Sequence, residues 1–308
     1  MKVLVTGASG FVGGVVAAAF ARAGHQTLGL DVRPAAGVPW QSAAVDVFSP
    51  LLGQHLAQFN PEVVFHGVGS ANVGRSFVDP TADRHLNVDS FAALLDTIRA
   101  AGVRPRVFLP SSAAVYGNPA TIPTPEECPL APISPYGVHK RMCEDLATGY
   151  GTVLGLEVTV LRVFSLVGPT QRRLLVWELF EQLAAGAAEL TLQGSAEASR
   201  DYLGAQDFGA AVVALAGVPA PPPILNVASG RGLKVATVAQ HIKTRVGSNA
   251  PTRFSGAVRP GDPLQWCADV SRLRSVLGTW EPQPARDAIF QSVDVWRGVE
   301  EPRRSGTP

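Results

Sequence analysis

The chain opens on a short apolar run, Val3-Leu4-Val5, that leads directly into glycines at positions 7, 10 and 13. A buried run followed by glycines and then by the alanine-rich segment 15–23 is typical of a strand, a tight turn and a helix. The glycines let the backbone approach a phosphate, and the amino end of the helix offers N–H donors and a partial positive charge. This segment therefore predicts a β-α unit that binds a pyrophosphate.

The glycine spacing is G-x-x-G-x-x-G, a variant of the more common G-x-G-x-x-G fingerprint. Asp31 ends a second apolar run, Thr27-Leu-Gly-Leu30, about 20 residues further along, where an acidic side chain binds the ribose hydroxyls of a dinucleotide. The same carboxylate repels a 2′-phosphate, so it favours NAD over NADP. Arg33 lies two residues later and weakens that preference. We predict NAD as the cofactor.

Tyr136 and Lys140 are four residues apart, so on a helix they lie on the same face. A phenol beside an ammonium group can lose its proton below its usual pKa of about 10. A phenolate near a nicotinamide can take the proton of a secondary alcohol whose carbon gives up hydride. Working near neutral pH requires lowering the phenol pKa by roughly 3, worth about 4 kcal/mol. An exposed surface pair is the alternative, and the glycine segment favours the catalytic interpretation.

Helical and strand patterns alternate along the chain, which predicts an α/β fold with a doubly wound parallel sheet and right-handed crossovers. We expect strands at 2–6, 26–31, 62–66, 106–110 and 157–163, a helix at 87–100, and a loop over the site at 119–135. We expect residues 1–168 to form the cofactor-binding domain, with a returning segment near 203–230; residues 169–297 to form mainly a smaller α/β substrate-binding lobe; and 298–308 to be a flexible tail.

Composition excludes several classes of protein. The chain has 308 residues, of which 46% are hydrophobic, and a net charge of +1. Without a basic patch it is not expected to bind nucleic acid or a membrane surface. Cys128, Cys143 and Cys267 have no metal-binding or disulfide spacing, so no metal is expected. No signal peptide and no apolar run of membrane-spanning length is seen, so we expect a cytoplasmic protein.

Further motifs follow in order along residues 2 to about 296. They are TGASGFVGG, Val45-Asp-Val47, His66-Gly-Val-Gly69, Asn87, SSAAVYG (111–117), YGVHK (136–140), Leu161-Arg-Val-Phe-Ser165, Gly168-Pro169, Arg200-Asp-Tyr202, Asn226-Val-Ala-Ser-Gly230 and Arg259-Pro-Gly-Asp262. With them the chain resembles the extended short-chain dehydrogenase/reductase family. The branch that it resembles acts on nucleotide-diphosphate sugars and includes UDP-glucose 4-epimerase-like enzymes.

The resemblance implies a Rossmann-type fold and a set of functional residues. The implied catalytic residues are Ser112, Tyr136 and Lys140. The implied NAD contacts are Gly7, Gly10, Phe11, Val12, Gly13, Asp31, Asp46, Val47, Gly67, Val68, Gly69, Asn87, Tyr136, Lys140 and Phe164. A nucleoside diphosphate sugar would contact Ser112 and Ser165, with Arg200 and Arg259 on its diphosphate. The resemblance also implies a homodimer, in which helix 87–100 and the Tyr136 helix form a four-helix bundle.

Some positions depart from the family pattern. Gly67-Val68-Gly69 stands where the family has Leu-Ala-Ala or Phe-Ala-Gly, and Ser165 stands where it has asparagine, so the contacts there stay open. Ser111 is an alternative to Ser112 as the working hydroxyl, although the family register favours Ser112. Three other side chains are interpreted as structural or peripheral: Tyr116, His139, and His66 at the end of an apolar strand.

The overall reaction has several candidates. Sugar 4,6-dehydratases carry an Asp-Glu pair where this chain has Ala113-Ala114, and methyl groups cannot protonate a leaving hydroxyl. SSAAVYG and the segment Gly69–Ser76 resemble epimerase sequences, so we predict a 4-epimerase that works through a 4-keto intermediate. The alternatives are a 4-keto-6-deoxyhexose reductase, a decarboxylase or unusual dehydratase, and a non-catalytic dinucleotide-binding protein. Because Tyr136 and Lys140 are retained, the sequence disfavours the last.

Overall fold

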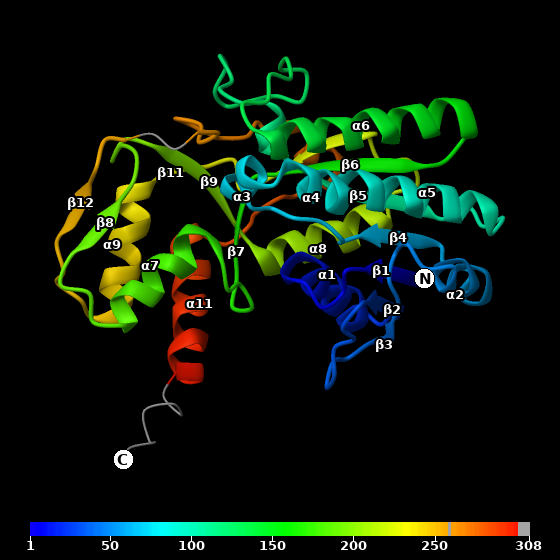
Figure 1. Ribbon diagram of the computed structural model, residues 1–308, viewed down its shortest axis with the longest axis horizontal. Coiled ribbons are helices and arrows are strands. Elements are labelled where there is room, and N and C mark those ends of the chain that lie inside the picture. The colour runs from blue at the N-terminus through cyan, green and yellow to red at the C-terminus, as the bar shows by residue number, and fades with distance from the viewer. Residues whose placement is uncertain (258–259, 301–308) are drawn as a thin grey trace.

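A seven-stranded parallel sheet forms the centre of the protein (Figure 1). The computed structural model describes residues 1–257 and 260–300, with the side chains of 299 and 300 left out. The strand order is β10-β6-β5-β4-β1-β2-β3. These strands are β1 (Lys2–Thr6), β2 (Gln26–Asp31), β3 (Gln41–Ala44), β4 (Val63–His66), β5 (Arg106–Ser112), β6 (Val158–Val163) and β10 (Ile224–Val227). The predicted doubly wound α/β fold is confirmed.

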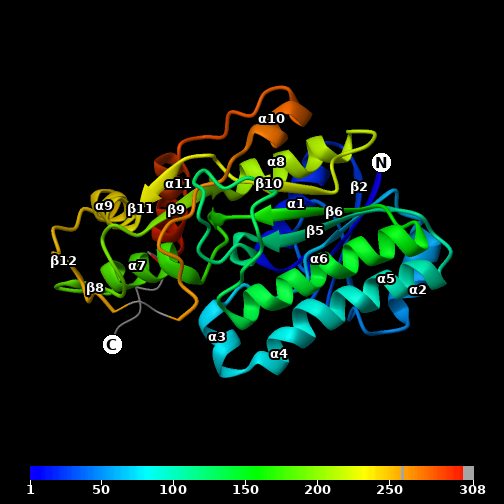
Figure 2. The same cartoon turned by 90° about the horizontal axis from the view of Figure 1, so that it is seen from above.

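Both faces of the sheet are covered by helices, and this explains why its strands are apolar throughout. In β1, Val3 and Val5 enter one core while Leu4 enters the other, because successive side chains point to opposite faces. Figure 2 shows the two helical layers. One layer contains α1 (Phe11–Arg22), α8 (Ala205–Ala216) and α10 (Ser271–Leu277), and the other contains α2 (Leu51–Phe59), α5 (Ser90–Ala100) and α6 (Pro135–Leu154).

The topology creates a crevice at the carboxyl edge of the sheet. Strand β1 lies between β2 and β4, because the chain continues from β1 to β2 and β3 on one side and then crosses back to β4 on the other side of β1. Ligands of doubly wound folds bind at such a switch point. The glycines that follow β1 and β4 therefore lie where a dinucleotide would be expected.

Two small sheets and three helices enclose a separate hydrophobic core. One sheet has the order β11-β9-β7 and the other pairs β12 with β8. The elements are β7 (Ser165–Val167), α7 (Leu174–Ala184), β8 (Leu190–Leu192), β9 (Ser199–Gly204), β11 (Gly232–Lys234), α9 (Val235–Val246), β12 (Thr252–Phe254) and α11 (Ala285–Glu300). The rings of Trp177, Phe180 and Trp296 meet at the centre of this core, 5.0 to 5.5 Å apart.

The helix predicted at 87–100 begins earlier than expected. A continuous helical run comprises α4 (Pro80–Arg84), a π-helical turn η1 (His85–Asp89) and then α5, preceded by α3 (Val73–Val78). Asp79 caps α4, since its carboxylate accepts from the N–H of Ala82. The carbonyl of Asn87 on the π-turn accepts a hydrogen bond from the Cys143 thiol at 3.4 Å. The prediction missed the start because α4 lacks an apolar stripe.

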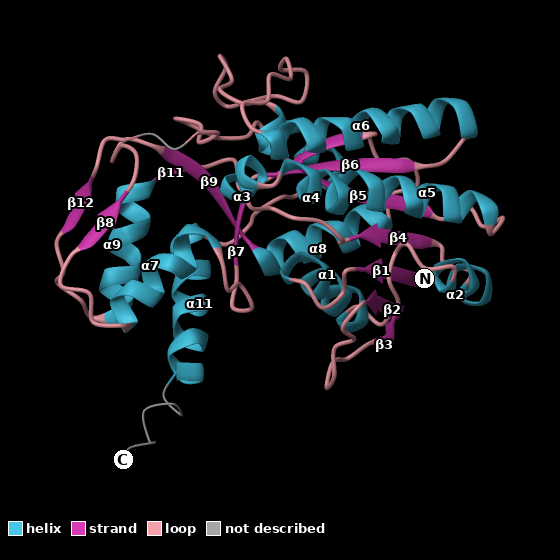
Figure 3. Ribbon diagram, in the orientation of Figure 1, coloured by secondary structure: helices cyan, strands magenta, loops and turns pink. Residues whose placement is uncertain are grey.

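Other predicted segments lie close to where the sequence placed them. Strands β1 and β2 have the predicted limits, and the others differ by one or two residues. The connection from the 3₁₀ turn η2 (Ala113–Val115) to α6 contains no regular element and is drawn as a loop in Figure 3. Helix α11 continues to Glu300, and residues 301–308 of the predicted tail lie outside the described residues. The domain limits stay a prediction.

No helix within residues 1–257 and 260–300 combines the length and the apolar character needed to cross a bilayer.

Asp201 on β9 connects three segments through its buried carboxylate. Oδ1 accepts from the N–H and the hydroxyl of Ser229, at 2.8 and 2.5 Å. Oδ2 accepts from the N–H groups of Gly230 and Ala268, at 3.0 and 3.2 Å. Burial raises the pKa of Asp201, and these hydrogen bonds counteract the rise. The carboxylate thus joins the small sheet to the segment after β10 and to the chain before α10.

We predict that Asp201→Ala lowers the free energy of unfolding by about 3 kcal/mol, because several buried donors lose their acceptor. Urea denaturation measures this directly. The control is Asp294→Ala, which removes an exposed partner of Arg245 and should cost less than about 1 kcal/mol. Equal losses for the two variants would contradict the anchoring role.

Candidate active site

Three backbone segments pack too closely at the switch point for any side chain to fit. A Cβ on Gly13 would lie 2.1 Å from the carbonyl oxygen of Gly7, and one on Gly7 would lie 2.6 Å from the carbonyl of Gly67. A Cβ on Gly67 would lie 2.6 Å from the oxygen of Thr6. The glycine at 67, where the family has leucine or phenylalanine, is therefore required here by the close approach of β4 to the first turn.

Helix α1 begins directly behind this turn. Its N-cap is Gly10, which makes no side-chain capping bond, so the first N–H groups of the helix are available to an anion. Phe11 packs against Gly168, whose Cβ would lie 3.2 Å from its ring, and Val12 packs against the adjacent core. The cradle has the shape and polarity that a pyrophosphate requires.

Acidic side chains follow the next two strands. At the end of β2, Asp31 accepts from the N–H of Ser9 at 3.1 Å and from the N–H of Arg33 at 3.0 Å. Asp46 follows β3 and accepts from the N–H of Phe48 at 3.0 Å, while Val47 is buried. An oriented carboxylate beside the glycine cradle fits the ribose of an adenine dinucleotide. These residues therefore fit NAD at this edge.

Tyr136 and Lys140 lie together at the start of α6. The helix begins here because Ser134 caps it, accepting from the N–H of Gly137 at 3.0 Å, and Pro135 takes the first position. The Tyr136 N–H donates to Ser76 Oγ at 3.1 Å. Lys140 Nζ lies 5.9 Å from the centroid of the Tyr136 ring. Both side chains are buried, as the four-residue spacing predicted for one face.

The environment of Tyr136 opposes ionisation more than the sequence implied. Burial raises the pKa of Tyr136 to about 12, and a hydrogen bond with Ser112 lowers it. Burial also lowers the pKa of Lys140, while Cys143, Asp83 and Glu144 oppose that change. Working near neutral pH therefore needs more stabilisation of the phenolate than the usual tyrosine value of about 10 suggested.

The two adjacent serines have different partners. Ser111 is buried and donates to Glu144 Oε1 at 2.5 Å, so its hydroxyl is already engaged. Ser112 ends β5, accepts from the N–H of Ala114 at 3.1 Å and hydrogen-bonds Tyr136. The geometry favours Ser112 as the working hydroxyl.

A buried polar network lies behind the serines and was not predicted from the sequence. Arg162 of β6 donates to both oxygens of Glu144, at 2.7 to 3.2 Å. Its Nη1 also donates to the hydroxyl of Tyr116 at 2.9 Å, and that hydroxyl donates to Asn226 Oδ1 at 2.7 Å. Burial raises the pKa of Tyr116 to about 12. Tyr116 therefore has the structural role that its sequence position suggested.

Residues after β4 and on the π-turn line the same edge of the sheet. Asn87 accepts from the N–H of Ser70 at 3.3 Å and donates to the carbonyl of Asp83 at 3.0 Å. A Cβ on Gly69 would lie 2.8 Å from Asn87 Oδ1, so a side chain at this position would displace the Asn87 amide. Val68, between the two predicted glycines, packs against the core on the α5 side of the sheet.

His66, at the end of β4, is enclosed by hydroxyl groups. Its ring lies 3.0 Å from Thr6 Oγ1 and 3.3 Å from Ser90 Oγ. Burial lowers the pKa of His66 to about 3, and Lys140 adds to the effect. The imidazole is therefore neutral at physiological pH and has a structural role.

Two of the other substrate residues predicted from the resemblance, Ser165 and Arg200, lie on β7 and β9 of the small three-stranded sheet. Arg200 on β9 contacts Asp262 at 3.1 Å, and its guanidinium lies 5.6 Å from the ring of Trp266. Phe164 is buried, with its ring 6.2 Å from that of Trp266. Ser165 begins β7, paired with Tyr202. Arg259 lies outside the described residues. Trp266 was missed, although an aromatic residue closely following the RPGD motif was a usable signal.

Comparison with known proteins bears on these features together. The family model described as the NAD dependent epimerase/dehydratase family matches residues 3–228, which is most of the chain. The chain belongs to this family. The cofactor prediction agrees, because the family is NAD-dependent.

Named relatives align with this member of the NAD dependent epimerase/dehydratase family over almost its whole length. It is 30% identical to a UDP-glucose 4-epimerase of Mycolicibacterium smegmatis, over 96% of this chain and 99% of that protein. The structure of a Thermus thermophilus UDP-glucose 4-epimerase complexed with NAD is 26% identical, with a TM-score of 0.87 over 97% of this chain and 99% of that one. An NAD-dependent NDP-hexosamine 5,6-dehydratase, TunA, is 29% identical with a TM-score of 0.86, over 96% and 98%.

The two serines give a prediction for this family member. We expect Ser112→Ala to lower kcat by about 10²-fold at a cost in stability of no more than about 1 kcal/mol, because it removes a hydroxyl that hydrogen-bonds the Tyr136 phenol and caps a single N–H, that of Ala114. Ser111→Ala should instead lower the free energy of unfolding by about 1–3 kcal/mol, because Glu144 loses a buried donor. Steady-state kinetics and urea denaturation separate the two effects. A larger loss of kcat in Ser111→Ala would reverse the assignment.

Proposed function

We propose that the protein is an NAD-dependent nucleotide-sugar epimerase that inverts C4 of a nucleoside diphosphate hexose through a transient 4-keto sugar. The observation that carries this proposal is that buried Tyr136 and Lys140 and half-buried Ser112 lie together beside a dinucleotide cradle. The family and the named relatives support the reaction class.

Each member of the set has a separate task. Bound NAD supplies the hydride acceptor, and afterwards the donor, at C4. Tyr136 takes the proton of the C4 hydroxyl and later returns it to the opposite epimer. Lys140 favours the phenolate by its charge, and Ser112 hydrogen-bonds the same sugar oxygen. Because Tyr136 and Lys140 are each less than a tenth exposed, little water competes for these protons.

The floor of the site disfavours a 4,6-dehydration. Ala113 and Ala114 are 0% and 5% exposed and present only methyl groups where that reaction needs an acid and a base. A 4-keto sugar formed here would keep its C6 hydroxyl and be reduced again. The first alternative is a reductase that exchanges its cofactor in every turnover, and kinetics distinguish it from an epimerase; a decarboxylase, an unusual dehydratase and a non-catalytic protein are the less favoured alternatives.

Arg200 is proposed to hold the substrate diphosphate. Its guanidinium is oriented by Asp262 and by the face of Trp266, and its side chain is 11% exposed. A planar guanidinium held in this way can bind phosphate oxygens in a bidentate manner. Arg259 is proposed as the second arginine on the basis of its RPGD motif alone.

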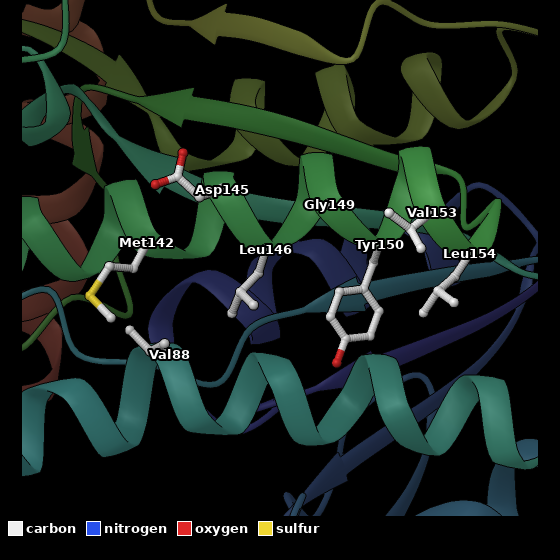
Figure 4. A pocket seen from close by; sticks show the side chains of 8 residues that line it. All are labelled: Val88, Met142, Asp145, Leu146, Gly149, Tyr150, Val153 and Leu154. Carbon is white, nitrogen blue, oxygen red and sulfur yellow. The ribbon is translucent and has the colours of Figure 1, made fainter.

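We propose that a second copy of the chain covers the groove between α5 and α6. The groove measures about 620 Å³ and is mostly apolar, and Figure 4 shows Leu146 and Tyr150 of α6 directed toward α5. Met142 and Val153 are 38% and 78% exposed, which is unusual for a helix face without a partner. Pairing two such faces gives a four-helix homodimer.

We also propose that the protein is cytoplasmic, and the free state of all three cysteines supports this location.

The first test of the function is to incubate the purified protein with UDP-glucose and then with a panel of nucleoside diphosphate hexoses. We expect interconversion of a sugar nucleotide with its C4 epimer and no net consumption of reduced cofactor. Tyr136→Phe should lower kcat by about 10²–10⁴-fold while leaving NAD binding and stability close to those of the wild type. Stoichiometric oxidation of reduced cofactor on a 4-keto sugar, without epimerisation of the panel, would establish the reductase instead.

The homodimer is tested by placing a charge on the exposed helix face. We expect Val153→Glu combined with Met142→Glu to convert the dimer to a monomer in sedimentation experiments, because two carboxylates would face apolar surface. The matched control is Val295→Glu on α11, also an exposed valine (46%), which should leave the mass unchanged. A wild-type protein that sediments as a monomer would refute the proposal.

A further inference from the structure

One buried titratable pair next to the site has no part in the proposed mechanism. Nδ1 of His139 lies 2.7 Å from Oδ2 of Asp83. The two side chains are 10% and 3% exposed. The other carboxylate oxygen, Oδ1, is buried and has no hydrogen-bond partner among the residues that the structure describes. A charge so poorly solvated acts strongly on the groups beside it.

The pair adjoins the catalytic residues on helix α6. His139 directly precedes Lys140 and follows Tyr136 by three residues, a spacing that makes two helical side chains neighbours. Asp83 lies on α4, which contacts α6. After burial, Asp83 is one of the groups that raise the pKa of Tyr136. An unneutralised Asp83 therefore works against the phenolate.

Other charges near Tyr136 are already balanced or exposed. From α6, Lys140, Cys143 and Glu144 face this region, and Arg162 of β6 is bound to Glu144. The remaining charged side chains on α3, α4 with its N-cap, the π-turn η1 and α6 are exposed or half-exposed; they are those of Arg75, Asp79, Arg84, His85, Asp89, Arg141 and Asp145. Glu144 is paired with Arg162, whereas Asp83 acts on Lys140 and Tyr136 through its charge. His139 is the side chain in contact with the Asp83 carboxylate, so its charge determines how far Asp83 is neutralised.

We propose that His139 and Asp83 are positioning residues: the imidazolium of His139 neutralises Asp83 and leaves the charge of Lys140 available to the Tyr136 phenolate. This inference rests on the proposed function of Tyr136. It replaces the structural or peripheral role that the sequence suggested for His139. The effect is exerted through Lys140 and Tyr136, and neither member of the pair contacts substrate.

The kinetic test compares four proteins over a range of pH. His139→Gln leaves Asp83 as an uncompensated anion, so the acidic limb of the kcat profile should move up by about one pH unit, a loss of about tenfold at a pH on that limb. Asp83→Asn should keep the wild-type profile, because the anion and the need for its counter-charge disappear together. The double variant Asp83→Asn with His139→Gln should then regain the wild-type profile. Additive losses in the double variant would show a structural hydrogen bond only.

A matched control comes from the second histidine–aspartate pair on the same helical run. His85 and Asp89 lie 3.2 Å apart, but their side chains are 54% and 30% exposed. His85→Gln removes an imidazole of the same chemistry in a solvated setting. It should leave the pH profile unchanged.

Protonation of His139 is also measured without turnover. The chain has six histidines, so ¹³C-labelling of the ring gives a tractable NMR spectrum, in which His139→Gln assigns the resonance. At pH 7 we expect imidazolium for His139 in the wild type and neutral imidazole in Asp83→Asn. A neutral ring in the wild type would overturn the proposal. Absence of epimerase activity would instead refute the proposed function, and the NMR result would still report the charge of the pair.

Discussion

The bidentate ion pair between Arg162 of β6 and Glu144 of α6 fixes where α6, the helix that carries Tyr136 and Lys140, lies. Both side chains are buried, and removing either would leave a charge without a partner in the core. Glu144 is four residues after Lys140, so every side chain on that face of α6 takes its position from this contact. The same guanidinium reaches Tyr116, and through it Asn226 on the edge strand β10. The chemistry of the site thus depends on a pair that never touches it.

Much of the sheet could be predicted because its strands are buried on both faces and are apolar throughout. Strand β3, Gln41–Ala44, was not predicted, because it lies at the edge of the sheet and its small and polar residues give no apolar run. Strands β7, β8, β11 and β12 have three residues each, too few for a period-two pattern to be recognised. Their positions depend on tertiary packing around Trp296 and its neighbours.

The site was predictable where local spacing determines geometry and not elsewhere. Tyr136 and Lys140 share a face through the helical period alone. Ser111 and Ser112 could not be distinguished by chemistry, because adjacent strand residues point to opposite faces and only the fold shows which one meets Glu144. Asp83 and His139 are 56 positions apart, and no local pattern reports a contact over that distance. Long-range pairs of this kind require the structure.

The π-turn at His85–Asp89 restricts where residues can be inserted into or deleted from this helical run. Its hydrogen bonds span one residue more than those of an α-helix, so it shifts the phase of the helix that contains it. Before the turn, Asp83 faces the site. After it, Phe91, Leu94 and Ile98 face the sheet. The turn accommodates one extra residue, so deleting a single residue at the turn would restore an ordinary α-helix, whereas deleting one elsewhere in this helical run would rotate one of these faces away from its partner. Insertions and deletions that the surface loops tolerate would therefore be selected against in this helix.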